Sequence, residues 1–542
     1  MQQGGLDALK DEHPGLFLRK STGLVRELGA RDSIWVNMGV ANPGIGFILL
    51  LPILAVYLQA DFTLPFVIGA IGCFFLALTY AQLVAVMPRT GGDYVFASRV
   101  FGPVMGAVIG GALLLMFCNF AGSNIAVLSQ VNFPFLFQGL GTMLHSSLVT
   151  GWAGDVSQKV PEAIVGIVVM AIVAVIATRG LRTMSRALFV CFAVGMVWYA
   201  VLVFLYATHS QAGFQAAFNA NAGHVGAYGA VVSQAKSLGL STGTTLAGSL
   251  AIIPFIFMLY GGFTWSVYPA GEVKRPMRTT LIATVAALVI SLVMYVAAWR
   301  GLTGMAGLNF LQSATWLSAN HPSVYGAITS APVTPAFYAL LVSADPVTKF
   351  ILAIGGVFWS FAILLAYVLV LPRIIFALAF DRVIPTAMAD VRQGTGTPVK
   401  AIVAAAIGIL VFGLLSILTS FITEFRNSVI VLELVFTVSS LACMVVPWVR
   451  RADFEAAPKV LGGRWFGLPA VSVIAAVSFI VNLAVLIVAV VSPQISGGYD
   501  VVSVVVVLVM VLWGVVAYFV SKTVMRSRGV DLALAMRELP PE

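Results

Sequence analysis

Long apolar runs are the feature that most limits how this chain can fold. A helix that crosses a bilayer needs about 20 mostly apolar residues, and runs of that length recur along the whole 542-residue sequence. They lie at 33–57, 62–87, 103–138, 161–178, 183–207, 246–270, 279–303, 346–378, 399–423, 428–449, 467–491 and 500–521. We therefore predict an all-α membrane protein with about twelve transmembrane helices.

The composition agrees with a lipid environment. Hydrophobic residues make up 60% of the chain and charged residues only 9%, against about 25% in an ordinary soluble domain. A soluble enzyme, a secreted disulfide scaffold, a disordered protein and a nucleic-acid binder are all poor fits. The four cysteines lie inside apolar runs, which favours small buried residues over disulfides. No HExxH, GxSxG or Walker A pattern occurs, so we expect no enzyme, no cofactor and no metal site.

The distribution of basic residues predicts the orientation. Lysine and arginine concentrate in every second connection, starting with the N-terminal segment, as the positive-inside rule requires of cytoplasmic loops. The other connections hold only Lys159, Lys236, Arg300, Lys349 and Arg426. We predict a multi-pass protein of the cell (cytoplasmic) membrane with both termini in the cytoplasm. The net charge of +9 then follows from topology, and no nucleic-acid partner is expected.

Two spans carry sequences that interrupt a helix near its middle. The first span reads Asn-Pro-Gly-Ile-Gly at 42–46, where Pro43 lacks a backbone donor and the glycines weaken the helix. The sixth span reads Tyr-Gly-Gly-Phe at 260–263. A break in mid-membrane is tolerated only beside a protein-lined or wet cavity. Either sequence alone is typical of helix packing, but the pair, five spans apart, indicates a transporter site.

The two breaks suit a zwitterionic ligand. The half-helix after the first break offers amide donors near Gly44, Ile45 and Gly46 to an anionic group, with Asn42 beside them. The half-helices before the breaks end in carbonyls that suit an ammonium group or a small cation. An α-amino acid is the simplest molecule that carries both groups.

Other polar residues inside the spans have two readings each. Asn119 and Ser123 in the third span, and Ser360 in the eighth, either bond to other helices or line the cavity. Glu433, in the tenth span, is either a functional carboxylate or a partner of Arg426. Glu272 ends the sixth span and belongs either to an inner gate or simply to the membrane interface.

Three motifs resemble those of one transporter superfamily. Residues 88–94 read P-x-x-G-G-x-Y, residues 260–276 join an aromatic-glycine break to E-V-x-x-P, and residues 373–385 read R-x-x-x-A-x-x-x-D-x-x-x-P. In order and placement they resemble the amino acid–polyamine–organocation superfamily of secondary transporters. The resemblance covers about residues 30–450.

The resemblance implies a leucine-transporter-like 5+5 inverted repeat plus two C-terminal helices, working by alternating access. Long polar connections fall at about 208–245 and 304–345. The implied organisation is a cytoplasmic segment 1–32, a first five-helix repeat 33–207, an extracellular loop 208–245, a second repeat 246–450, accessory helices 451–522 and a cytoplasmic tail 523–542.

The resemblance also implies roles for the residues at the breaks. Substrate lies between spans 1 and 6, flanked by spans 3, 8 and 10. Gly44 and Ile45 correspond to residues that meet the carboxylate. The amine-binding positions correspond to Tyr260, Gly261 and Gly262, and Phe263 to an aromatic lid.

Two departures from the family pattern stand out. The family often reads G-S-G-I-F where this chain has 42–46, so Pro43 removes one amide from the carboxylate site. Some members carry a lysine in span 5 that stands in for a sodium ion, and the aligned position here is Gly195. Proton coupling through that lysine is therefore not expected.

The sequence as a whole predicts a secondary transporter of amino acids or related amines. A small neutral substrate is favoured, because the centres of spans 1, 3, 6 and 8 hold no acidic or basic residue. A co-transported proton or sodium ion is an expected partner, besides the substrate and the bilayer. The alternatives are a sodium-coupled symporter of another small solute, or a sensor that binds ligand without moving it.

Overall fold

The computed structural model describes residues 24, 26–392, 396–419, 427–496, 501–529 and 532. In this part of the chain, twelve helical segments are long and apolar enough to cross a membrane. The expected fold class, an all-α membrane protein with about twelve spans, is thereby confirmed.

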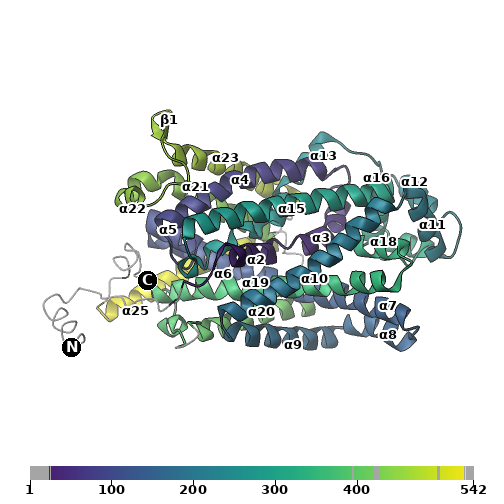
Figure 1. The fold of residues 1–542 in the computed structure, drawn as a ribbon, viewed down its shortest axis with the longest axis horizontal. Helices are drawn as coiled ribbons and strands as arrows, with labels where there is room; N and C mark the ends of the chain where they lie inside the picture. The colour runs from purple at the N-terminus through teal and green to yellow at the C-terminus, as the bar shows by residue number, and fades with distance from the viewer. Residues whose placement is uncertain are drawn as a thin grey trace.

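The spans run roughly along the long axis of the molecule (Figure 1). In chain order they are α2–α3 (Ala30–Ala41, Pro43–Val56), α4 (Thr63–Val86), α6–η1–α7 (Pro103–Val127, Leu128–Asn132, Phe133–Met143), α9 (Lys159–Thr178), α10 (Leu181–Thr208), α13–α14–η2 (Leu246–Ala251, Ile253–Tyr260, Gly261–Val267), α15 (Pro276–Ala306), α19 (Pro346–Phe380), α20 (Val399–Leu418), α21 (Asn427–Val449), α23 (Ala470–Val491) and α25 (Val501–Ser527).

Short elements connect the spans. The two long polar connections contain helices of their own rather than extended loops. The connecting elements are α5 (Asp93–Phe101), α8 (Ser147–Val156), α11 (Gln211–Ala222), α12 (Ala227–Ser237), η3 (Ala270–Glu272), α16 (Leu308–Asn320), α17 (Pro322–Ile328), α18 (Pro335–Val342), η4 (Thr386–Ala389), α22 (Arg451–Ala456), the strands β1 (Arg464–Trp465) and β2 (Leu468–Pro469), and α24 (Pro493–Ser496).

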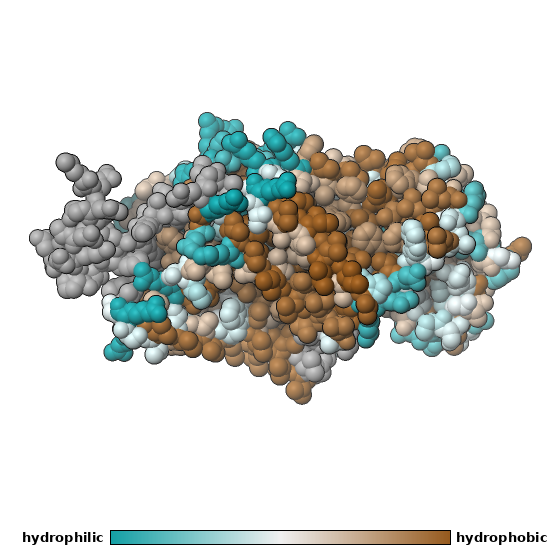
Figure 2. All heavy atoms as spheres, turned by 90° about the horizontal axis from the view of Figure 1, so that it is seen from below, coloured by the Kyte–Doolittle hydropathy of each residue, from teal (hydrophilic) through white to brown (hydrophobic). Residues whose placement is uncertain are grey.

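The face seen in Figure 2 carries a broad hydrophobic band across the middle of the bundle, with hydrophilic residues gathered toward its two ends. The band matches a lipid-facing belt, because a soluble protein rarely exposes an apolar patch of this extent. We call the two ends the α5 end, where α5 and α22 lie, and the α11 end, where α11 and α12 lie (Figure 1).

Glycines let neighbouring helices approach closely. At Gly106 of α6, an added Cβ would lie 2.3 Å from Cβ and 2.8 Å from Cα of Ser98 on α5. At Gly514 of α25, it would lie 2.0 Å from the carbonyl oxygen of Ala107. Helices in lipid associate largely through such close packing of small residues, so these positions fix how α5 and α25 pack against α6.

Gly106→Ala should therefore destabilise the protein. Overpacking of this kind costs about 1–3 kcal/mol, so we expect a lower apparent melting temperature for purified protein in detergent. Gly151→Ala in α8 is the control, because nothing lies within 4 Å of its added Cβ. Equal melting temperatures for the two variants would contradict the close α5–α6 contact.

Candidate substrate site

The first span is interrupted at Asn42. Helix α2 ends at Ala41 and α3 begins at Pro43, and Asn42 between them adopts the left-handed conformation with φ 38° and ψ 67°. Asparagine tolerates this region better than most residues. Its Oδ1 accepts a hydrogen bond from Ile45 N (2.9 Å), and its Nδ2 donates to the carbonyl oxygen of Trp359 in α19 (2.7 Å). Asn42 thus caps α3 and joins the break to the eighth span.

This cap occupies part of the expected anion site. Ile45 N is bound by Asn42 Oδ1, and Gly46 N donates to the backbone oxygen of Asn42 (3.0 Å). The Gly44 position lies against the Trp359 indole, since an added Cβ would be 2.4 Å from its ring atoms. In this conformation, therefore, two of the three amides that the sequence offers to a carboxylate already have acceptors.

The sixth span changes helix type at its glycines. Helix α14 ends at Tyr260, and the chain continues as the 3-10 helix η2 from Gly261. An added Cβ on Gly262 would lie 2.2 Å from Ala41 N, and Ser266 N donates to Asn37 Oδ1 of α2 (2.7 Å). The interrupted parts of spans 1 and 6 are therefore in direct contact.

A cavity of about 420 Å³ lies between the two interrupted spans. Its walls come from spans 1, 3, 6, 8 and 10, the set that the sequence resemblance implies. No acidic or basic side chain is among the residues that line it: Val40, Ala41, Asn42, Ile45, Gly46, Leu49, Phe120, Ser123, Asn124, Ala126, Val127, Gln130, Val131, Met258, Leu259, Gly261, Gly262, Trp265, Ile363, Tyr367 and Leu432.

About half of the residues proposed from sequence for the substrate or gate line this cavity. Those that do are Asn42, Ile45, Gly46, Ser123, Gly261 and Gly262. Ser123 Oγ is buried and has no hydrogen-bond partner in the described part of the chain. It is therefore a hydroxyl that a ligand could use without breaking an existing bond.

The remaining candidates lie outside the lining. Gly44 faces Trp359, and Phe263 is fully buried. Asn119 donates to Ser428 Oγ (3.1 Å), and Tyr260 donates to the carbonyl oxygen of Phe66 (3.0 Å). The remaining three, Ser360, Glu272 and Glu433, also lie outside the lining and are described below. The roles proposed for these seven residues stay predictions, because none of the seven lines the cavity.

Ser360 joins spans 3 and 8. Asn132 Nδ2 donates to Ser360 Oγ (2.7 Å), and Asn124 Nδ2 donates to the Ser360 carbonyl oxygen (3.0 Å). Ser360 Oγ in turn donates to Asn124 Oδ1 (3.3 Å). Hydrogen-bonding to another helix is thus what this structure shows for Ser360.

The sequence reasoning missed Gln130, which a π-helical turn carries to the cavity. Phe133 N donates to Leu128 O, five residues earlier. Pro134 has no N–H for the Gln130 carbonyl, so the regular pattern cannot continue there. Gln130 Nε2 donates to both carboxylate oxygens of Glu162 (3.1 and 3.2 Å). Gln130 also lines a neighbouring cavity of about 170 Å³ toward the α11 end. In the sequence, Pro134 was the signal that could have indicated the π-helical turn at Gln130.

Aromatic rings close the cavity on its α5 side. Trp265 stacks on Phe117 with ring centroids 3.9 Å apart, and meets Tyr367 edge-on at 4.9 Å. Tyr268 packs against Phe117 and Trp265 at 5.5 and 5.9 Å. These four rings form a floor, which we call the aromatic floor, between the cavity and the α5 end.

A buried carboxylate lies below the aromatic floor. Asp93 accepts hydrogen bonds from Tyr268 (2.6 Å), from Ser439 (2.5 Å) and from Tyr80. Burial raises the pKa of Asp93 above its ordinary value, and the bonds from Ser439, Tyr268 and Tyr80 work against that rise. Asp93 thus connects the chain after η2 with spans 2 and 10.

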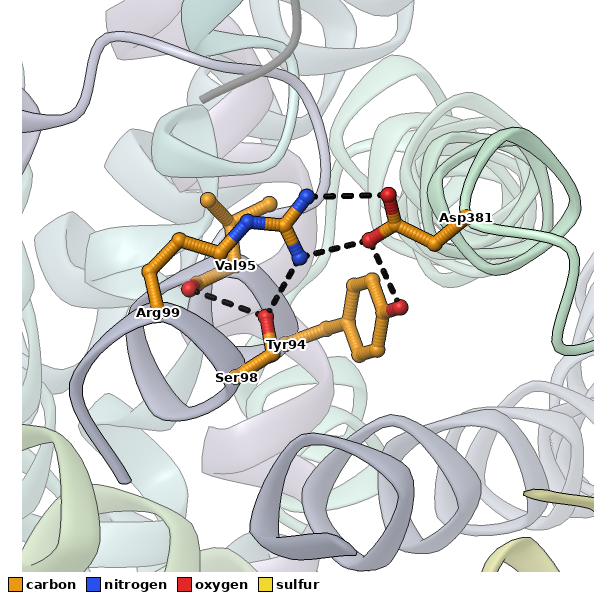
Figure 3. Close-up of polar contacts among 5 residues, drawn as sticks. All are labelled: Tyr94, Val95, Ser98, Arg99 and Asp381. Atoms are coloured by element: carbon orange, nitrogen blue, oxygen red, sulfur yellow. Dashed lines mark hydrogen bonds and ion pairs between the residues drawn. The ribbon is translucent and has the colours of Figure 1, made fainter. Parts of the chain in front are cut away.

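Two buried ion pairs complete the closure of the α5 end. Arg373 of α19 holds Glu272 through Nε and Nη2, at 2.9 Å each. Arg99 of α5 holds Asp381 through two bonds of 2.6 and 2.9 Å, and Tyr94 donates to the same carboxylate at 2.8 Å (Figure 3). Bidentate pairs of this kind are strong and directional, so they fix spans 6 and 8 to their neighbours.

The backbone also joins the ends of spans 1 and 6. Glu27 N and Leu28 N donate to the Glu272 carbonyl oxygen (2.9 and 3.0 Å), and Lys274 N donates to Leu28 O (2.8 Å). The segment before α2 therefore pairs with the segment after η3. The two interrupted spans are connected both at the cavity and at the α5 end.

Comparison with known proteins identifies the family. The family model for amino acid permeases matches residues 34–516. This chain belongs to the amino acid permease family. Its relatives are transporters rather than enzymes.

Three bacterial transporters are among the relatives. The branched-chain amino acid permease BcaP of Bacillus subtilis is 34% identical over 125 residues, which cover 23% of this chain and 26% of the relative. The methylthioribose transporter of the same species is 24% identical, covering 72% of this chain and 76% of the relative. BcaP of Lactococcus lactis is 24% identical, covering 70% and 75%.

The tenth span of this permease holds Glu433. Its side chain is fully buried, and neither carboxylate oxygen has a hydrogen-bond partner in the described part of the chain. The proposed partner Arg426 lies outside the described residues, so that pairing stays a prediction. Gly195, which we align with the lysine that some family members carry, lies against Trp359, whose Cε2 would be 2.6 Å from an added Cβ.

The Glu272–Arg373 pair makes a testable contribution to stability. Glu272→Gln leaves the Arg373 charge buried and unbalanced, and breaking such a pair costs about 3–5 kcal/mol. We expect a clear fall in the permease's apparent melting temperature in detergent. Asp390→Asn is the control, because its pair with Lys400 is exposed and should contribute little. A similar shift in both variants would show that the buried pair has no special weight.

Proposed function

We propose that this permease is a secondary active transporter of neutral amino acids, working by alternating access across the cell membrane. The observation that carries the proposal is the cavity of about 420 Å³ at the interrupted spans, with no acidic or basic side chain in its lining. A net-neutral zwitterion needs no fixed counter-charge there. It needs backbone donors and acceptors at the helix breaks, and an apolar wall for its side chain.

The two sides of the cavity divide the recognition. A carboxylate bound at the break replaces the bonds that Ile45 N and Gly46 N make to Asn42 in this conformation. The free hydroxyl of Ser123 supplies a further polar contact. Met258, Ile363 and Leu432 offer an aliphatic wall. Two of the relatives are branched-chain amino acid permeases, and an aliphatic side chain suits this wall. We propose Leu, Ile and Val as the substrates to examine first.

The structure suits one stage of the transport cycle. The α5 end is closed by the aromatic floor, the Asp93 cluster and two ion pairs, whereas a second cavity adjoins the substrate cavity toward the α11 end. Most basic residues of the connections belong to the α5 end, so we propose that this end and both termini are cytoplasmic. Substrate then enters from outside, and the α5 end must open to release it.

One relative favours a second candidate solute. The methylthioribose transporter aligns with 72% of this chain, and a neutral thio-sugar also needs no counter-charge. Such a solute, coupled to sodium, is the alternative within transport. A sensor that binds ligand without moving it is the alternative outside transport.

Uptake into proteoliposomes tests the function. We expect accumulation of labelled leucine, isoleucine or valine, inhibited by the other two but not by lysine or glutamate. Proton and sodium gradients are imposed separately, and empty liposomes give the background. Methylthioribose uptake without amino acid uptake would replace the substrate. Binding without uptake would favour the sensor.

Ser123→Ala tests the site itself. Loss of one hydrogen bond to substrate costs about 0.5–1.5 kcal/mol, so the half-saturating concentration should rise by about two- to tenfold. Ser472→Ala is the matched control, because Ser472 Oγ is also buried without a partner but lies on α23, away from the cavity. Unchanged transport by Ser123→Ala would remove this hydroxyl from the substrate site.

A further inference from the structure

We propose that Glu433 binds the proton that this permease co-transports, and that the proton leaves toward the α5 end through Tyr80 and Asp93. The inference rests on the proposed function, because it names the coupling ion and its site. It is carried by two observations on Glu433. No hydrogen bond in the described structure reaches its carboxylate, and its neighbour in sequence, Leu432, lines the proposed substrate cavity.

The surroundings of Glu433 favour its protonated form. The side chain is 0% exposed, and no ion pair or hydrogen bond reaches its carboxylate from the described residues. A bare carboxylate in such a place is costly, whereas a neutral acid is tolerated. The proposal therefore assigns a proton to Glu433 in this conformation, and a change in its surroundings is needed to release that proton.

The helices packed against α21 offer few ionisable groups. From α4, Cys73 and Tyr80 interact electrostatically with Glu433. From α14, Tyr260 neighbours Cys73. On α6 the cysteine is Cys118, and Ala470–Val491 of α23 contains no ionisable side chain. The remaining neighbouring helices carry their ionisable groups as follows: α25 has Tyr518, Lys522 and Arg526, and α5 has Asp93, Tyr94 and Arg99. The ionisable residues of α22 include Arg451, Asp453 and Glu455.

Glu433 is adjacent to a residue that touches the substrate site. Leu432 lines the cavity, and its Cδ2 would lie 2.8 Å from an added Cβ on Gly261. Any movement of span 6 at Gly261 therefore acts on α21 at Leu432. Through this contact, a change at Gly261 on substrate binding can alter the surroundings of Glu433 and so its protonation.

Tyr80 provides the route from Glu433 to the α5 end. Its hydroxyl donates to Asp93, which also accepts from Tyr268 below the aromatic floor. No hydrogen bond joins Glu433 to Tyr80 in this conformation, so the proton is held. When the α5 end opens and Tyr268 moves with span 6, Glu433 can pass its proton to the Tyr80 oxygen while the Tyr80 proton passes to Asp93. Tyr80 ends neutral, Glu433 ends as carboxylate, and Asp93 releases the one proton to solution.

Glu433→Gln separates coupling from substrate movement. Glutamine keeps the size and neutrality of the protonated acid, so exchange of labelled for unlabelled leucine should stay within about twofold of wild type. Accumulation driven by a proton gradient, and the proton influx that leucine triggers in dye-loaded vesicles, should both fall to background. Glu455→Gln, an exposed carboxylate in α22, should retain both.

Tyr80→Phe tests the route without altering Glu433. It removes the hydroxyl alone, so exchange should persist while proton influx slows at least severalfold. It also keeps the proposal testable if Glu433→Gln fails to fold, which size-exclusion chromatography reveals.

Proton-driven accumulation that survives in Glu433→Gln would overturn the inference, as would wild-type leucine uptake that ignores the pH gradient. Normal proton influx in Tyr80→Phe would overturn the route. Wild-type protein that moves no amino acid at all would instead overturn the proposed function, so the two failures are distinguishable.

Discussion

The hydrogen bonding of Asn42 is the interaction on which the substrate site depends. Lipid cannot satisfy an exposed backbone amide or carbonyl, so an interrupted span needs an internal partner for each freed group. The Asn42 side chain serves both halves of the span, accepting from Ile45 N of α3 and donating to the Gly39 carbonyl of α2 (3.3 Å). It also donates to the Trp359 carbonyl of α19. The left-handed residue ends α2, starts α3 and fixes both to α19, and the cavity lies beside this junction.

The closure of the α5 end differs in kind from that junction. Its ion pairs, Arg373–Glu272 and Arg99–Asp381, are buried and bidentate. Pairs of this type stabilise one geometry strongly but gain little over apolar contacts overall, because desolvation offsets the attraction. Such contacts suit a closure that must be specific when shut and must still open. The bond from Ile45 N to Asn42 Oδ1, in contrast, is local to the first span, so opening of the α5 end does not require it to break.

The sequence predicted the features that follow from chain-local physics. Apolar run length predicted the ends of the spans to within about six residues. The helix geometry changes at Asn42 and at Gly261, which lie in the 42–46 and 260–263 sequences. Side-chain partners across the bundle were beyond its reach. Nothing local shows that Asn119 is engaged by Ser428, that Tyr260 points to Phe66, or that Asn124 and Asn132 both hold Ser360. Those contacts depend on how distant spans rotate about their axes.

The distribution of charge indicates that the two faces of α21 have different functions. The face with Leu432 meets a cavity whose lining holds no acidic or basic side chain, so the proposed substrate would bind there through backbone dipoles and hydroxyls. The next residue, Glu433, points into a different environment, where Cys73 and Tyr80 are the ionisable neighbours on α4. In the proposed ion-coupled cycle a neutral substrate contributes no net charge, so the group that responds to the ion gradient would lie elsewhere in the protein. In the described spans, an unpaired buried carboxylate one residue behind the cavity wall meets that requirement without placing a charge in the substrate's path.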